Sequence, residues 1–138
     1  MASLDANGTV TLSGNRQDVF SLPFDATLEN IYMTVNSRAT FTFPSGITVR
    51  PFLELYTAAP DSNVFTPVPS TKLTVQPGYS GGPIPSNTAQ AASVRQIGLQ
   101  LTAGTRVLIG GHLEISGTGP LLHTYYFYFT GGIALKQQ

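Results

Sequence analysis

ITVRPFLELYTAAPDSNVFTPVPSTKLTV, residues 47–75, carries the clearest structural pattern in the chain. Apolar and polar side chains alternate over its first ten residues, and this two-residue period is typical of a strand with one buried face. The buried side is predicted to hold Ile47, Val49, Leu53 and Leu55. Pro60 and Asp61 then favour a turn, and residues 71–75 begin a further apolar segment. The stretch therefore predicts two strands joined by a long, stiff connection.

The connection contains two prolines, Pro67 and Pro69, shortly after Phe65. Proline has a fixed φ and no backbone N–H, so this segment is predicted to be extended but excluded from the centre of a sheet. The apolar side chains of Val64, Phe65 and Val68 are expected to cap one end of a barrel or sandwich.

Length and composition limit the possible functions. The 138 residues are predicted to form a single domain, residues 1–138, which is large enough for a hydrophobic core without disulfides or metal. Seven basic and seven acidic residues give no basic patch for nucleic acid, and no apolar run is long enough for membrane insertion. A net charge of zero with 41% hydrophobic residues favours self-association.

Short apolar segments separated by glycine, proline, serine and threonine predict an all-β fold. Strands are expected at residues 8–12, 17–22, 27–36, 39–43, 47–56, 71–75, 95–101, 106–115 and 121–135. Residues 87–95 are the nearest candidate for a short helix, and the Gly- and Pro-rich residues 76–86 are predicted to form a surface loop. Gly131 and Gly132 suggest a bulge or bend in the last strand. Eight or nine strands in one domain favour a jelly-roll β-sandwich.

The last predicted strand is aromatic on both faces. A strand of a two-layer sandwich has one face in the core and the other in water. Two interpretations remain open: the tyrosine hydroxyls are solvated, or the strand lies in a subunit interface. The second interpretation predicts a homotrimer whose interface contains Tyr125, Tyr126, Phe127, Tyr128 and Phe129.

Two segments resemble a known family. Residues 53–75, LELYTAAPDSNVFTPVPSTKLTV, and residues 101–108, LTAGTRVL, are similar to parts of the C-terminal domains of BclB- and BclA-type exosporium glycoproteins, which are surface proteins of bacterial spores. The resemblance extends over residues 20–135, and residues 1–17 show no clear match. The Phe-Thr-Pro-Val-Pro run is its most specific part.

The resemblance implies a fold and a function. Domains of this family, like the complement and tumour-necrosis-factor-like domains to which they are similar, are jelly rolls that assemble as trimers. A collagen-like Gly-X-Y region usually precedes them, and these 138 residues contain no such repeat. The chain is thus expected to be a non-enzymatic trimerisation or tip domain of a collagen-like filament protein. Its expected location is the spore surface (exosporium) or the extracellular space, with other spore-surface or appendage proteins as partners.

Few residues suggest chemistry. His112 and Glu114 share a strand face, but no further ligands complete a metal site, so no metal or cofactor is predicted. His123 precedes the aromatic strand and is expected at a subunit contact or a strand end. The segment around Ser80 lacks the spacing and the strand-to-helix context of a nucleophile elbow, so no catalytic residue is predicted. An enzyme would need a polar cleft joining His112 or His123 to an acid and a nucleophile.

The alternative function is a lectin-like or receptor-binding adhesion module. Such a module would present aromatic and amide side chains in exposed loops. Tyr79 and Asn87, within residues 76–90, are the best candidates.

Overall fold

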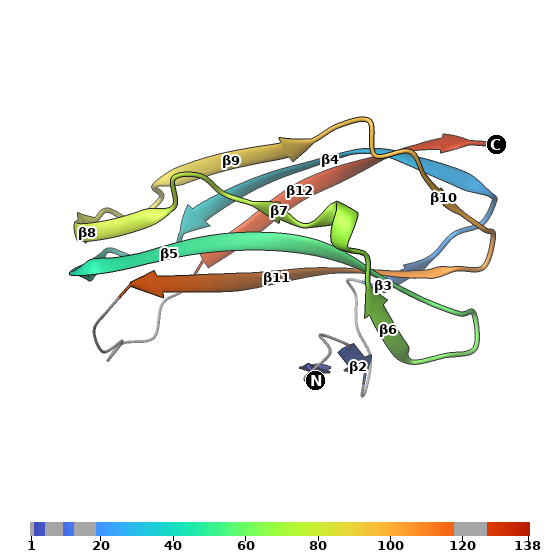
Figure 1. The fold of residues 1–138 in the computed structure, drawn as a ribbon, viewed down its shortest axis with the longest axis horizontal. Helices are drawn as coiled ribbons and strands as arrows, with labels where there is room; N and C mark the ends of the chain where they lie inside the picture. The colour runs from blue at the N-terminus through green and yellow to red at the C-terminus, as the bar shows by residue number, and fades with distance from the viewer. Residues whose placement is uncertain (1, 5–9, 13–18, 118–126) are drawn as a thin grey trace.

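The computed structural model describes residues 2–4, 10–12, 19–117 and 127–138. In these residues twelve strands form two antiparallel sheets packed as a β-sandwich, accompanied by one short 3₁₀ helix and no α-helix (Figure 1). The predicted all-β fold is confirmed.

The smaller sheet is built around β4, Ala26–Ser37. β9 (Ala89–Val94) and β10 (Leu99–Leu101) pair with one edge of β4, and β12 (Phe127–Gln137) pairs with the other edge (Figure 1). The β4–β12 ladder runs from Ser37, opposite Phe127, to Ala26, opposite Gln137.

The larger sheet is built around the long strand β5, Phe41–Ala58. The whole of β11 (Arg106–Gly117) pairs with one edge of β5, and β3 (Val19–Ser21) pairs with the far edge of β11. The other edge of β5 pairs in turn with β8 (Tyr79–Ile84), β7 (Leu73–Thr74) and β6 (Val64–Pro67). β6 also pairs with β2, so the prediction that the proline-containing segment is excluded from the centre of a sheet was wrong. The remaining elements are β1 (Ala2–Leu4), β2 (Val10–Leu12) and the 3₁₀ helix η1 (Pro69–Thr71).

The main core lies between the two sheets. All four residues predicted to form the buried side of the first strand, Ile47, Val49, Leu53 and Leu55, are buried. Leu53 and Leu55 pack in one cluster with β4 residues from the facing sheet, which are Leu28, Ile31, Met33 and Val35. The sequence alternation thus identified the core face of β5 correctly.

A second, smaller cluster covers part of the opposite face of the larger sheet. It consists of Tyr56, Ala58, Phe65 and Leu108. Phe65, on β6, has no exposed surface, which confirms the prediction that its ring is buried. Val68 packs against the main core instead, and Val64, which was also expected to cap the sandwich, is 49% exposed.

Several local predictions were wrong. The two strands expected at residues 39–43 and 47–56 form one continuous strand, β5. Residues 79–84 form β8 rather than a loop, because β5 offers a free edge with which their backbone can pair. Residues 89–94 form β9 rather than a helix, since they pair with β4 in the same way. The register shift in β12 falls between Ala134 and Leu135 and not at the glycine pair.

The strand expected at residues 95–101 is also shorter in the structure. Only residues Leu99–Leu101 are paired, because Gln96 and Gly98 adopt positive φ angles of 57° and 67° that interrupt an extended strand.

Candidate functional site

β12 carries three of the five aromatic residues predicted to form a subunit interface. Phe127 and Phe129 are partly buried and pack against the main core, and the ring centroid of Phe127 lies 5.1 Å from that of Tyr79. Tyr128 is 52% exposed. Tyr125 and Tyr126 lie outside the described residues. The described part of the strand therefore has a core-facing side with two phenylalanines and a solvent-facing side with one tyrosine.

Tyr128 belongs to the outer face of the small sheet, a surface formed by three rows of outward-facing residues. The rows follow the strand register across β12, β4 and β9. They are Tyr128–Asn36–Ala89, Thr130–Thr34–Ala91 and Gly132–Tyr32–Ser93. None of these nine residues carries a charge, and most are small. These nine residues themselves therefore add no charged group that contact with another protein would desolvate.

Two tyrosines stand at opposite rows of this face. Tyr32 is 43% exposed, and the Arg95 guanidinium lies 5.7 Å from its ring centroid. The Arg38 guanidinium lies 5.5 Å from the Tyr128 ring centroid. Each tyrosine ring therefore lies within cation–π distance of a guanidinium group. Arg38 and Arg95 thus flank an otherwise uncharged surface.

The same face is hollowed beside Tyr32. A depression of about 300 Å³ lies between β4 and β9. The outward side chains that line it are Tyr32, Thr34, Ala91, Ser93 and Arg95. The depression exists because the β9 residues opposite Tyr32 and Thr34 are small.

Neither a protein-family model nor a curated protein nor a solved structure matches the chain. In the described part of the chain, no helix has the length and apolarity to span a lipid bilayer.

The residues predicted for a binding loop are not brought together in one. Tyr79 is 1% exposed, and its hydroxyl lies 2.8 Å from the carbonyl oxygen of Thr88 and 3.3 Å from that of Val35. Burial raises the pKa of Tyr79. The prediction that Tyr79 is available to a ligand was wrong, since the side chain joins β8 to the core. Asn87 is exposed in the turn between β8 and β9, with a φ of 64°.

Tyr32 was missed as a surface candidate. It alternates with Ile31 and Met33, which are buried, and this period marks Tyr32 as outward-facing. The sequence signal was therefore present in β4, although nothing in it showed that β9 would supply small neighbours.

His112 and Glu114 do not form a chemical site together. The Nε2 atom of His112 is 2.8 Å from the Tyr56 hydroxyl, and its ring stacks on Phe52 with a centroid distance of 5.2 Å. Burial lowers the pKa of His112, and the charge of Glu54 opposes this shift. Within the described ranges, no three His, Asp or Glu side chains are grouped as a metal site would require. His123 lies outside these ranges.

Proposed function

We propose that this chain is a non-enzymatic structural domain, a jelly roll that forms a homotrimer at the tip of a collagen-like spore-surface filament. The family assignment rests on the resemblance of residues 53–75 and 101–108. The observation that supports assembly is the outer face of the small sheet, where Tyr32 and Tyr128 are exposed on an uncharged surface of small residues.

This face suits contact between copies of the chain. Tyrosine is enriched in protein interfaces because its ring buries apolar area while its hydroxyl can find a hydrogen-bond partner. The protruding Tyr128 and the depression beside Tyr32 lie on different rows of one face. A head-to-tail contact of the knob of one copy with the hollow of the next closes into a ring when three copies are related by rotation. In the proposed trimer, Tyr128 of each copy enters the depression of the next.

The mass of the protein in solution tests the trimer. Light scattering at low micromolar concentration should give about 44 kDa, three times the 14.7 kDa chain. Tyr128→Lys removes the knob and Ala91→Tyr fills the depression. Each variant should stay folded, and its mass in solution should fall below that of the trimer. Val64→Lys is the matched control, since Val64 is 49% exposed on a different sheet and its substitution should leave the trimer intact. A monomeric wild type, or equal effects of all three variants, would refute the proposed interface.

The structural role is tested with a fused stalk. Gly-Pro-Pro repeats placed before residue 1 should form a triple helix that melts at a higher temperature with the wild-type domain than with Tyr128→Lys, because a trimer brings the three chains into register. Equal melting temperatures, followed by circular dichroism, would show that the domain does not nucleate a stalk.

A lectin-like or receptor-binding module is the second candidate. The depression beside Tyr32 combines an aromatic ring, the hydroxyl-bearing residues Thr34 and Ser93, and the Arg95 guanidinium, which together suit a carboxylate-bearing sugar. A glycan array probed with wild type and Arg95→Gln separates the two functions. Binding that requires Arg95, by a protein that is monomeric, would favour the module.

A further inference from the structure

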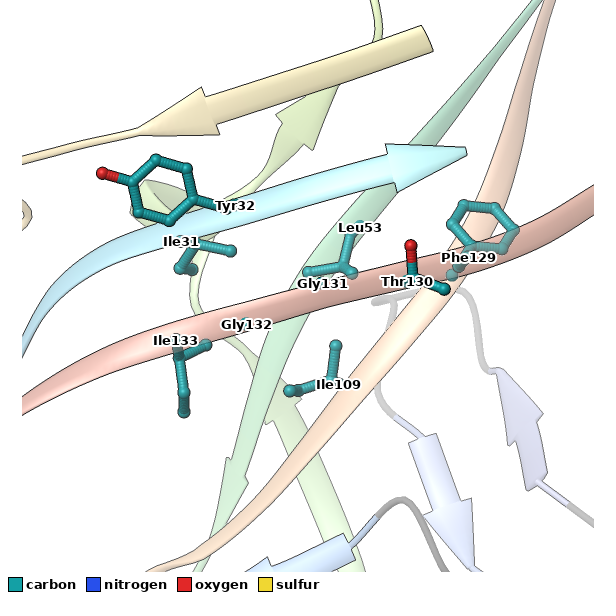
Figure 2. A pocket seen from close by; sticks show the side chains of 10 residues that line it. Ile31, Tyr32, Leu53, Ile109, Phe129, Thr130, Gly131, Gly132 and Ile133 are labelled. Atoms are coloured by element: carbon teal, nitrogen blue, oxygen red, sulfur yellow. The ribbon is translucent and has the colours of Figure 1, made fainter. Parts of the chain in front are cut away.

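A cavity of about 330 Å³ lies between the two sheets on the side where β11 and β12 face each other (Figure 2). It is lined mainly by apolar side chains from four strands. These are Ile31 of β4, Leu53 of β5, Ile109 of β11, and Phe129 and Ile133 of β12. None of the described residues that line it is charged. Protein interiors are close-packed, so a void of this size in so small a sandwich calls for a cause.

The cause is a pair of glycines at core-facing positions. Gly131 lies between Phe129 and Ile133 along β12 (Figure 2), and the two-residue alternation of a strand places it on their core-facing side; Gly111 is paired with the core residue Leu53. Neither position supplies a side chain to the space between the sheets. Both also resist a larger residue, since a Cβ on Gly131 would collide with the Tyr32 carbonyl oxygen and a Cβ on Gly111 would lie 3.1 Å from the Phe129 ring. The backbone therefore maintains the cavity.

The cavity reaches the molecular surface. Gly111, Thr130 and Gly132 line it and are exposed. In the described part of the fold, no strand pairs with the outer edge of β12, and β11 pairs only with β5 from Ile109 onward. Among the described residues, no ladder of backbone hydrogen bonds joins these two strand edges.

We propose that this cavity is a binding site for a small, uncharged, apolar molecule of about the size of two fused aromatic rings. An apolar cavity of about 150 Å³ is sufficient to bind benzene, and water in such a space has too few polar partners to be held there. The cavity here has about twice that volume. Its lining contains no charge to offset the desolvation of a charged ligand, so an uncharged occupant is the complementary one. Phe129 lies at one end of the site (Figure 2).

The site and the proposed trimer contact use mostly different residues, and Tyr32, Thr130 and Gly132 border both. Phe129, Gly131 and Ile133 face the core, whereas Tyr128, Thr130 and Gly132 belong to the outer face of the small sheet. A molecule between the sheets and a neighbouring subunit on the outer face would approach β12 from opposite sides.

Methyl NMR of the intact chain tests the proposal, with naphthalene as the probe. Naphthalene should shift the methyl signals of Ile31, Leu53, Ile109 and Ile133 in a saturable way, and leave that of Ile47 at the other end of the core unchanged. The same rings carrying a sulfonate, 2-naphthalenesulfonate, should bind much more weakly because the lining has no cation. Scattered or non-saturable shifts with naphthalene, or equal binding of the two compounds, would overturn the proposal.

Variants locate the site. Ile109→Phe fills the cavity and should abolish the saturable shifts. Ile115→Phe is the control, because Ile115 occupies the same side of β11 beyond the cavity and is 49% exposed. If Ile109→Phe does not fold, Ile133→Phe makes the same test from β12. A dilution series of the unliganded protein gives a second check. If the methyl signals of Ile31, Leu53, Ile109 and Ile133 shift as the assembly dissociates, a neighbouring subunit occupies the cavity and the proposal is overturned.

Discussion

The Tyr56 hydroxyl lies 2.8 Å from Nε2 of His112, and the two residues are held together across the β5–β11 ladder. Gly110 makes this contact possible, because a Cβ at that position would lie 2.9 Å from the Tyr56 ring and 3.1 Å from Nε2 of His112. On its other side the imidazole stacks on Phe52, whose ring also has the Lys72 ammonium 4.5 Å from its centroid. A histidine in this position is packed as a ring and resists protonation.

The unfolding free energy should therefore fall on acidification. The pKa of His112 is lowered in the folded protein by burial, with the charge of Glu54 opposing the shift. The contribution of the neutral imidazole to the unfolding free energy is complete above the ordinary histidine pKa of about 6.5. It is lost as the pH falls through the lower pKa that His112 has in the folded protein. Denaturant titrations of wild type and His112→Phe from neutral to mildly acidic pH measure the difference between their unfolding free energies. His123 is present in both proteins, so its contribution cancels in this difference. A difference that does not change with pH would contradict the prediction.

Phe65→Ala should destabilise the protein by about 3–5 kcal/mol, because the ring is fully buried against Tyr56, Ala58 and Leu108. Val64→Ala is the neighbouring control: Val64 is exposed, and its substitution should change the unfolding free energy by less than about 0.5 kcal/mol. Both are measured by denaturant titration. A loss below about 1 kcal/mol for Phe65→Ala would mean that the cluster on the outer side of the larger sheet contributes little.

Thr71→Val should cost about 1–3 kcal/mol although the two side chains have nearly the same shape. The Thr71 hydroxyl accepts the Leu55 backbone N–H at 2.9 Å and donates to the Val68 carbonyl oxygen at 2.6 Å, and Thr71 is buried. Valine would leave the Leu55 N–H without this partner. Thr66→Val, at an exposed position of β6, should be nearly neutral when its thermal unfolding is compared with that of Thr71→Val. Equal stabilities of the two variants would contradict the assignment.

The adjacent glycines of β12 should respond differently to alanine. A Cβ on Gly131 collides with the Tyr32 carbonyl oxygen, whereas a Cβ on Gly132 finds no atom within 4 Å. Gly131→Ala is expected to cost about 1–3 kcal/mol through overpacking, and Gly132→Ala to stay within about 0.5 kcal/mol. Thermal unfolding of the two variants measures the gap. Similar losses at both positions would show that the β4–β12 ladder adjusts more easily than the structure indicates.

The sequence predicted the core face of β5 because alternation is a local property. It did not predict the burial of Tyr56, which lies on the opposite face of the same strand. That burial depends on β6 bringing Phe65 onto the outer side of the larger sheet, a contact set by tertiary structure.

The strands β8 and β9 could not be recognised from side chains. Backbone pairing needs a neighbouring edge rather than an apolar pattern, and β5 and β4 provide such edges. The glycines of β8 suggested a loop in the sequence. In the structure, Gly81 and Gly82 adopt positive φ angles of 53° and 75°, and these angles are accommodated within a paired segment.

At the candidate interface, the sequence identified the aromatic strand but not the surface around it. The alternation of Phe127, Tyr128 and Phe129 agrees with the side on which each lies. The depression beside Tyr32 depends on β9 lying next to β4, and residues 87–95 gave no indication of that pairing.

The β4–β12 ladder also determines how the domain would respond to mechanical load. β4 begins at Ala26 and β12 ends at Gln137, and these two residues are paired at the same end of the ladder. Tension between them would act on that last pair alone and peel the strands apart one pair at a time, instead of shearing the whole ladder at once.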